Sequence, residues 1–439
     1  MGTLYKKVCR TPNLRKAARA VLTNAQKSTS ESTRDEAKNF QLSLDKHLSA
    51  LRKELVAGTF KFPPAHGVAA KKANKTTRRP IVIAPIKSRV VQRAILDVLS
   101  NLKFVKGVQK KWFNFGGVED GGVAKAIERT YRGAVHYPYY IRTDIKDFFT
   151  QVPKDALLAI VTKHTDDPQF DELLKTAIQV ELANIAELKD YKELFPLSSR
   201  GVAQGSCLSP LLCNLLLHDI DVHLNSGDCM SVRYIDDLII FAPNRSQAFK
   251  RLKELKQALG EFKLDAYDPP TRGKESDSSK AATGETKKGF SFLGCDVSPE
   301  AISPGKRARN SLLAKVDALC IAALASQRHL KTGTPMPMTF ASDPTMLSTL
   351  WRISNTVRAW GAAFSFCTDR RIFKQLDKDI EQQLADFRRN WSVKTKSLNV
   401  VERQRLLGMQ LLDDTNFKSD FAELVAFRAG TKLPKGGNK

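Results

Sequence analysis

The sequence lacks long hydrophobic runs, paired cysteines and enough acidic side chains to balance its basic ones. No uninterrupted apolar run approaches the roughly 18–20 residues that cross a bilayer, which argues against a membrane protein. The opening MGTLYKKVCR contains no apolar core of signal-peptide length. Seven cysteines are scattered without any C-x-x-C pair, so neither a zinc site nor a disulfide framework is indicated. We expect a cytoplasmic protein with small, buried cysteines.

The deficit of acidic residues is uneven along the chain. Across 439 residues, 71 basic and 46 acidic side chains give a net charge of +25. Residues 1–150 hold 30 basic and 11 acidic side chains, residues 151–300 hold 18 and 23, and residues 301–439 hold 23 and 12. Basic flanks suit a polyanion such as nucleic acid, and an acidic middle suits a metal site that handles phosphates. The alternative is a solvated basic surface.

Apolar spacing and turn residues predict the order of the elements. Helical spacing covers residues 1–57, 90–102, 123–132, most of 154–195, 246–260 and the chain from 306 onward, and Ser209 and Pro210 are predicted to open the helix that ends at 224. Alternating or β-branched runs predict strands around 79–84 and 139–145, and strand pairs in 231–243 and 290–298. The segments 58–78 and 268–289 are predicted to be loops.

One pair of adjacent acids stands out from two others. Asp166-Asp167 and Asp413-Asp414 lie in polar helical stretches, whereas Asp236-Asp237 is flanked by VRYI and LIIFA, which are β-formers. Asp144 likewise ends the β-type run YYIRTD. Like charges between buried strands are unfavourable unless a cation neutralises them, and such acids suit two-metal phosphoryl transfer. The alternative is turn acids exposed to solvent.

The same residues resemble the motifs of reverse transcriptases, specifically the bacterial kind related to group II intron, retron and phage-defence enzymes. Over roughly residues 50–390 the matching strings occur in the family's order: RRPIVIAPIKSRVVQRAI (78–95), DIKDFF (144–149), RGVAQGSCLSPLLCNLLL (200–217), YIDD (234–237) and GFSFLG (289–294). The string RRIFKQLDKDIEQQLADFRRNW is similar to the thumb helices of intron-type enzymes. The resemblance implies an α+β right-hand polymerase fold.

That fold implies three regions. Residues 1–135 would form N-terminal helices and fingers, and residues 136–300 a palm with a mixed sheet of the RRM or ferredoxin-like type and helices on one face. Residues 301–439 would form a helical thumb and a basic tail. Within the palm, the resemblance implies that Asp144, Asp236 and Asp237, with the carbonyl of Ile145, hold two Mg²⁺ ions, for which Mn²⁺ could substitute.

The resemblance also assigns residues to the incoming nucleotide. Arg79 would bind the triphosphate, with a second cation supplied by Lys72 or by its neighbours Lys71 or Lys75. Gln204 and Gly205 would line the nascent base pair. Phe149 would be the gate that excludes a ribose 2′-hydroxyl, unless it is a core aromatic beside Phe148. Lys274 is considered as the general acid toward pyrophosphate.

Further positions are expected to contact nucleic acid: Lys87, Arg89, Lys110, Tyr234 and Gly294. Lys87 and Arg89 could instead stabilise the fold of the fingers. The cluster from Lys110 to Phe115 could stack on template bases, although packing of Trp112 and Phe115 under the fingers is the favoured interpretation.

The resemblance implies an RNA-templated DNA polymerase that adds dNTPs to a primer 3′-hydroxyl, with an RNA:DNA hybrid or DNA as product. We expect its template to be a dedicated noncoding RNA in bacterial antiphage defence, with no membrane partner and with oligomer formation left open. One alternative is a template-independent or protein-primed DNA polymerase of the abortive-infection type. The other is a maturase-like RNA-binding protein.

Overall fold

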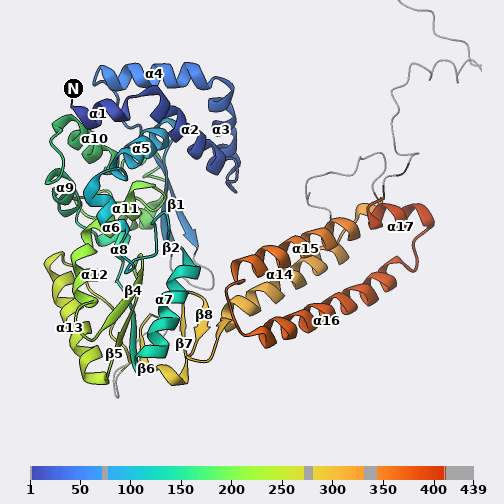
Figure 1. The fold of residues 1–439 in the computed structure, drawn as a ribbon. Helices are drawn as coiled ribbons and strands as arrows, with labels where there is room; N and C mark the ends of the chain where they lie inside the picture. The colour runs from blue at the N-terminus through green and yellow to red at the C-terminus, as the bar shows by residue number, and fades with distance from the viewer. Residues whose placement is uncertain (1, 72–77, 271–279, 331–343, 410, 412–439) are drawn as a thin grey trace, which may run out of the picture. The chain divides into compact units, whose positions relative to one another are not determined.

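The computed structural model describes residues 2–71, 78–270, 280–330, 344–409 and 411, and it divides the chain into two compact units. Unit 1 comprises Met1–Leu293 and Val297–Glu300, and unit 2 comprises Gly294–Asp296 and Ala301–Lys439. Both are visible in Figure 1, and each is described here by itself. The finer division of unit 1 into fingers and palm stays a prediction.

Unit 1 begins with a layer of amphipathic helices, as the sequence predicts for residues 1–57. These are α1 (Thr3–Val8), α2 (Thr11–Ala25), α3 (Glu31–Leu42) and α4 (Leu44–Val56). The first three contact α5 (Ile86–Leu99), and α4 packs on α2 and α3. Helix α2 buries Leu14, Ala18 and Val21 on one face, at the spacing of a core-facing helix. This layer joins the main apolar core of the unit.

The hairpin that follows corrects one prediction. Strand β1 (His66–Lys71) lies inside the segment predicted as a loop and pairs antiparallel with β2 (Arg78–Ile83). The sequence HGVAAK carries few β-formers, so β1 owes its conformation to tertiary partners. One is Asn184, whose side chain accepts from the Gly67 N–H at 2.8 Å and donates to the Gly67 carbonyl at 3.0 Å.

The remaining helices of unit 1 surround a sheet. They are α6 (Lys103–Gln109), α7 (Val123–His136), α8 (Phe148–Gln151), α9 (Lys154–Thr162), α10 (Pro168–Ile178), η1 (Lys189–Leu194), α11 (Leu208–Leu216), α12 (His218–Leu224), α13 (Arg245–Glu261) and η2 (Thr286–Lys288). The predicted cap at Ser209 is wrong, because the helix starts at Leu208 and the Ser209 hydroxyl donates to the Ala203 carbonyl at 2.8 Å. The predicted single helix is interrupted at Leu217.

The central sheet has the strand order β4-β5-β3-β6, with β3 (Tyr139–Asp144), β4 (Met230–Tyr234), β5 (Asp237–Ala242) and β6 (Ala282–Glu285). Its three strand pairs are all antiparallel, so the predicted mixed sheet is wrong. Helices α12 and α13 lie on one side and α7 on the other (Figure 1), not on one face as predicted. Strand β6 falls in the predicted 268–289 loop, where pairing with β3 outweighs the polar sequence ATGE.

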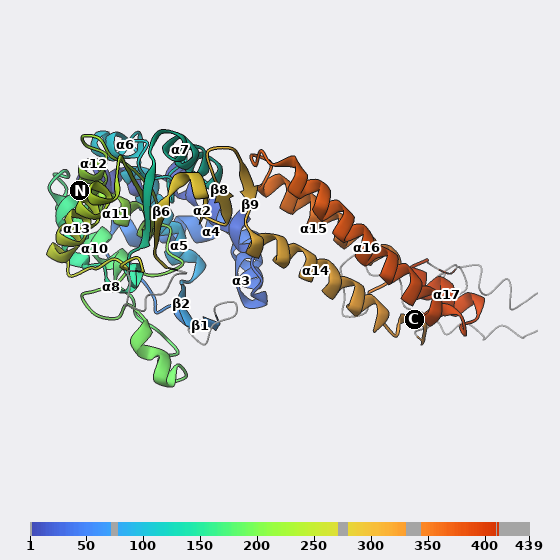
Figure 2. The same cartoon turned by 90° about the horizontal axis from the view of Figure 1, so that it is seen from below.

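Unit 2 is mainly helical, as predicted for the chain from 306 onward. After β7 (Phe290–Phe292) in unit 1 come β8 (Cys295–Val297) and β9 (Ile302–Pro304), and then α14 (Lys306–Leu324), η3 (Arg328–Leu330), α15 (Met346–Ala363), α16 (Arg370–Thr395) and α17 (Val400–Leu407). Helices α14, α15 and α16 lie side by side in Figures 1 and 2. Their core includes Val316, Ile353 and Phe387.

Two features bear on the predictions from composition. All seven cysteines are free thiols, and six of them are buried, which agrees with their interpretation as small hydrophobes. Among the helices of the described residues, none has both the length and the apolar character to cross a membrane.

Candidate active site

Three carboxylates meet at one end of the central sheet. Asp144 ends β3 and is the direct cross-strand partner of Asp237, which begins β5. Asp236 lies in the tight turn between β4 and β5, and its carbonyl accepts the N–H of Ile145 at 3.0 Å. The backbone therefore brings together residues that are 92 positions apart in the sequence. Cross-strand neighbours of like charge repel one another, so this arrangement is stable only with compensation.

The electrostatics of these acids report that repulsion. Burial first, and then the charges of Asp236 and Asp144, together raise the pKa of Asp237 to about 6. Burial, followed by the charge of Asp144, also raises the pKa of Asp236. Buried carboxylates this close together are costly to ionise on their own. A bound divalent cation would offset that cost, and Mg²⁺ prefers such oxygen ligands.

Lys280 provides a compensating charge that the sequence prediction missed. Its Nζ lies 2.6 Å from Oδ2 of Asp144 and 5.6 Å from the ring centre of Tyr267. The Tyr267 N–H donates to the Asp144 carbonyl at 3.1 Å, and the Tyr267 carbonyl accepts from the Thr143 hydroxyl at 2.7 Å. Lys280 lies two residues before the start of β6, inside the segment 268–289 that is predicted from the sequence to be one loop, so no strand pattern pointed to it.

The donor set fits divalent cations, although the side chains are not preassembled around one. In the described part of the chain, no three His, Cys, Asp or Glu side chains stand close enough to form a metal cluster. Burial and neighbouring acid charges raise the pKa values of Asp236 and Asp237, and Oδ2 of Asp144 already lies 2.6 Å from the ammonium of Lys280. Asp144, Asp236 and Asp237 are the residues that would hold the ions.

A cavity of about 750 Å³ opens beside the acids. Its lining includes seven of the predicted residues: Arg79, Asp144, Ile145, Phe149, Gln204, Gly205 and Asp236. Arg79 is exposed on β2, and its charge opposes the rise in the pKa of Asp236. The cavity has the size of a small-molecule site and a cationic side opposite an acidic one.

Two of these residues are held by backbone contacts. The Phe149 carbonyl accepts the Val202 N–H at 2.7 Å, and its ring is half-buried against Phe148, so it both packs on the core and lines the cavity. Gly205 has φ +125°, and a Cβ there would lie 2.6 Å from the Val82 carbonyl oxygen. A glycine is therefore required by the approach of β2, independently of any nucleotide.

Other cavity residues were not predicted. Arg78 stacks over the ring of Tyr191, 4.6 Å from its centre, and donates to the Ala69 carbonyl at 2.9 Å. Arg200 donates to the carbonyls of Phe262 and Lys263. Arg78 and Arg200 both line the cavity. The sequence shows Arg78 beside Arg79 in the same motif, which could have suggested a role for it. Its stacking on Tyr191 is a contact between distant segments that the sequence does not indicate.

The structure places the predicted nucleic-acid residues in several environments. Lys87 lies 3.7 Å from Glu54 and over the ring of Phe60, and burial lowers the pKa of Arg89. Lys110 is exposed at the end of α6, Tyr234 ends β4, and Gly294 has φ +79°. Their roles stay predictions. Lys72, Lys75 and Lys274 lie outside the described residues.

The aromatic cluster is only partly as expected. Phe115 is buried, with 4% of its surface exposed, but Trp112 is 60% exposed, so the favoured interpretation of joint packing is wrong for Trp112. The backbone of this segment explains the difference. Phe113 and Phe115 exchange backbone hydrogen bonds with Arg233 of β4, which turns Phe115 inward. Trp112 precedes this paired stretch.

Comparisons with known proteins support the motif assignment. Residues 70–297, just over half of the chain, match the family described as "Reverse transcriptase (RNA-dependent DNA polymerase)". The chain is 28% identical over 196 residues to protein YkfC of Escherichia coli, which covers 42% of this chain and 47% of YkfC. It is 23% identical over 178 residues to the group II intron-encoded protein LtrA of Lactococcus lactis, covering 40% and 28%.

These matches span less than half the length of either relative. Among solved structures, a partial Cas6-RT-Cas1–Cas2 complex matches with 20% identity and a TM-score of 0.33, over 59% of this chain and 43% of that one.

Proposed function

Because this chain belongs to the reverse transcriptase family, with the right-hand polymerase fold that its α+β architecture predicts, we propose that it synthesises DNA on an RNA template. The observation that carries the proposal is the cross-strand pairing of Asp144 with Asp237, with Asp236 in the adjoining turn, beside a cavity lined by Arg79. A pair of divalent ions bound there would supply activation of a primer 3′-hydroxyl and neutralisation of the leaving pyrophosphate.

The residues around the cavity have distinct proposed roles. Arg79 binds the triphosphate of the incoming nucleotide through its forked guanidinium, and Gln204 orients the base from the strand-like segment paired with β2. Lys280 is the proposed proton donor to pyrophosphate, because its ammonium lies 2.6 Å from Oδ2 of Asp144 and its side chain lines the cavity.

Phe149 is proposed as the gate against ribonucleotides, because its half-buried ring lines the cavity close to Asp144 in sequence and space. A Phe149→Val variant should incorporate ribonucleotides several-fold more readily while its use of dNTPs changes little, as measured by competition on one primed template. A variant that unfolds, or that keeps the wild-type preference, would support a purely packing role.

Polymerase activity is testable directly. Purified full-length protein with Mg²⁺, dNTPs and a primed RNA template should extend the primer with DNA, and Asp236→Ala should abolish extension. A parallel reaction without template separates the alternatives. Equal product without template would favour a template-independent or protein-primed polymerase, and RNA binding with no synthesis would favour a maturase-like protein.

We further propose, on the motif resemblance to bacterial defence enzymes, that the template is a dedicated noncoding RNA. The basic side chains of residues 1–150 and 301–439 support binding of a polyanion. Sequencing the RNA and DNA that co-purify with the protein from its host should recover one abundant RNA and its complementary DNA. A random sample of cellular RNA would contradict a dedicated template, and unaltered phage growth after deletion would contradict a defence role.

A further inference from the structure

The turn that carries Asp236 has an unfavourable backbone. Ile235 has φ +62°, in the left-handed region that β-branched residues rarely adopt. Such a conformation costs of order 1–3 kcal/mol and persists only where the surroundings impose it. The contacts that impose it therefore also set the direction in which Asp236 and Asp237 leave the turn.

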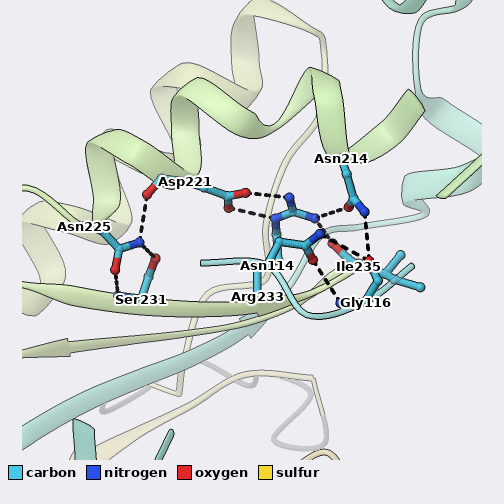
Figure 3. A network of polar contacts seen from close by, with 8 residues as sticks. All are labelled: Asn114, Gly116, Asn214, Asp221, Asn225, Ser231, Arg233 and Ile235. Carbon is cyan, nitrogen blue, oxygen red and sulfur yellow. Dashed lines mark hydrogen bonds and ion pairs between the residues drawn. The ribbon is translucent and has the colours of Figure 1, made fainter. Parts of the chain in front are cut away.

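One of those contacts comes from a buried arginine. Nη1 of Arg233 donates to the Ile235 carbonyl at 2.9 Å. The same guanidinium donates from Nε and Nη2 to the two carboxylate oxygens of Asp221, at 2.8 and 2.6 Å, and from Nη1 to Oδ1 of Asn214 at 3.0 Å. Figure 3 shows Asp221 and Asn214 reaching down from their helices to Arg233 on the strand below. We call Asp221, Arg233 and Asn214 the buried brace.

All three members of the buried brace are shielded from water. Arg233 is 1% exposed, Asn214 2% and Asp221 3%. A buried ion pair contributes little net stability, because desolvation offsets the attraction, and apolar residues of similar volume often replace such pairs without loss. An apolar replacement cannot donate a hydrogen bond to the Ile235 carbonyl. What the buried brace adds is therefore geometry rather than stability.

A second element holds the turn from the other side. The Arg233 N–H donates to the Phe113 carbonyl at 2.8 Å, and the Phe115 N–H donates to the Arg233 carbonyl at 2.9 Å. Nδ2 of Asn214 donates to the Gly116 carbonyl at 2.8 Å, which ties this segment to the buried brace. A Cβ on Gly116 would lie 2.6 Å from Cγ1 of Ile235, so the segment rests directly on the turn.

We propose that the buried brace positions the metal-binding acids, by fixing the Ile235 carbonyl and so the left-handed turn from which Asp236 and Asp237 project. Arg233 is a positioning residue and touches no substrate. The proposal rests on the proposed function only for its consequence in catalysis. Its direct consequence is divalent-ion affinity, which is measurable without DNA synthesis.

The deciding variant replaces the ion pair as a unit. Asp221→Leu combined with Arg233→Met removes both charges and leaves no unpaired buried ion, so the fold should persist. Binding of Mn²⁺ by the purified full chain, followed by electron paramagnetic resonance, should weaken about 10-fold or more. If DNA synthesis occurs, kcat at saturating dNTP should fall while KM for dNTP stays near the wild-type value.

A matched control exists at the other end of the same network. Asn225 donates to the Ser231 hydroxyl at 2.6 Å and to the Asp221 carbonyl at 2.8 Å, with no contact to Ile235 (Figure 3). Ser231→Ala removes a buried hydrogen bond from β4 but leaves the Ile235 carbonyl held. It should bind Mn²⁺ like the wild type.

Each outcome decides the proposal. A folded double variant with wild-type Mn²⁺ affinity would overturn it, as would equal weakening in Ser231→Ala. If the double variant fails to fold, Arg233→Lys decides, because an ammonium can pair with Asp221 but lacks the fork that also reaches Ile235. That variant should show weakened Mn²⁺ binding, and unchanged binding would overturn the proposal. Wild-type protein that binds Mn²⁺ but makes no DNA would sink the proposed function alone.

Discussion

Two fully buried cations contact different segments of the candidate active site, and their hydrogen-bond acceptors differ. Arg233, beside the turn that carries Asp236, is paired with the carboxylate of Asp221 through two hydrogen bonds. Lys154, at the start of α9, is also 1% exposed but donates to neutral oxygens: the carbonyls of Ser198 at 2.6 Å and Pro196 at 3.0 Å, and Oε1 of Gln179 at 3.4 Å.

The two cations differ in whether a carboxylate compensates their charge. Burial lowers the pKa of Lys154, whose ammonium has only neutral oxygens as its hydrogen-bond acceptors among the described residues. Lys154 supports the segment 195–200, whose Phe195, Ser198 and Arg200 line the cavity. The turn that carries Asp236 therefore rests on a buried cation paired with a carboxylate, and the segment 195–200 rests on a buried cation held by neutral oxygens. Four predictions test that contrast.

The largest effect is expected from breaking the paired charge alone. Arg233→Met leaves the carboxylate of Asp221 buried without its cation, which costs about 3–5 kcal/mol in free energy of unfolding. Chemical denaturation of the variant and of the Asp221→Leu/Arg233→Met double variant measures this. The double variant should recover most of the loss, and a single variant as stable as the double one would contradict a buried ion pair.

A smaller effect is expected from crowding the turn. Gly116→Ala places a methyl group against Ile235 and should lower the free energy of unfolding by about 1–3 kcal/mol, as overpacking does. Gly107→Ala is the matched control, since its Cβ meets nothing within 4 Å and it lies inside α6. The control should be neutral or more stable. Equal losses in the two variants would show that the turn tolerates the extra atom.

Removing the unpaired cation should cost less than breaking the ion pair. Lys154→Met leaves the carbonyls of Pro196 and Ser198 without a donor, at about 1–3 kcal/mol, but it also removes a poorly solvated charge. We expect a net loss of about 1 kcal/mol and a raised KM for dNTP, with Mn²⁺ affinity unchanged. Weaker Mn²⁺ binding in this variant would mean that the two sides of the site are not separable.

The smallest effect is a pH dependence. Since the folded-state pKa of Lys154 lies below its ordinary value of 10.5, the unfolded chain binds more protons between those two pKa values. Wild-type stability relative to Lys154→Met should therefore rise with pH across that window and be lowest below it. Denaturation of both proteins between pH 7 and pH 10 measures the difference, and a difference that falls with rising pH would contradict the assignment.

The family, and the three acids proposed as the site, followed from local sequence. Acids at the ends of β-type runs identified Asp144, Asp236 and Asp237, because a short buried strand imposes its pattern on a few contiguous residues. Helices at 1–57 and beyond 306 followed from apolar spacing for the same reason. The match over residues 70–297 confirms the motif assignment.

Contacts between distant segments could not be predicted from local sequence patterns. Strand β1, strand β6 and the antiparallel order of the whole sheet depend on partners far along the chain, and HGVAAK or ATGE alone indicates no strand. Lys280 at Asp144 is likewise a contact across 136 residues.

The sequence by itself determined the family and the candidate acids, since motif order and strand patterning are local properties. Only the tertiary structure decided how the turn is held, because Asp221, Asn214 and Gly116 reach Arg233 and Ile235 through packing of two helices and a loop. A buried hydrogen bond exists only where folding has already excluded water, and no stretch of sequence carries that information alone.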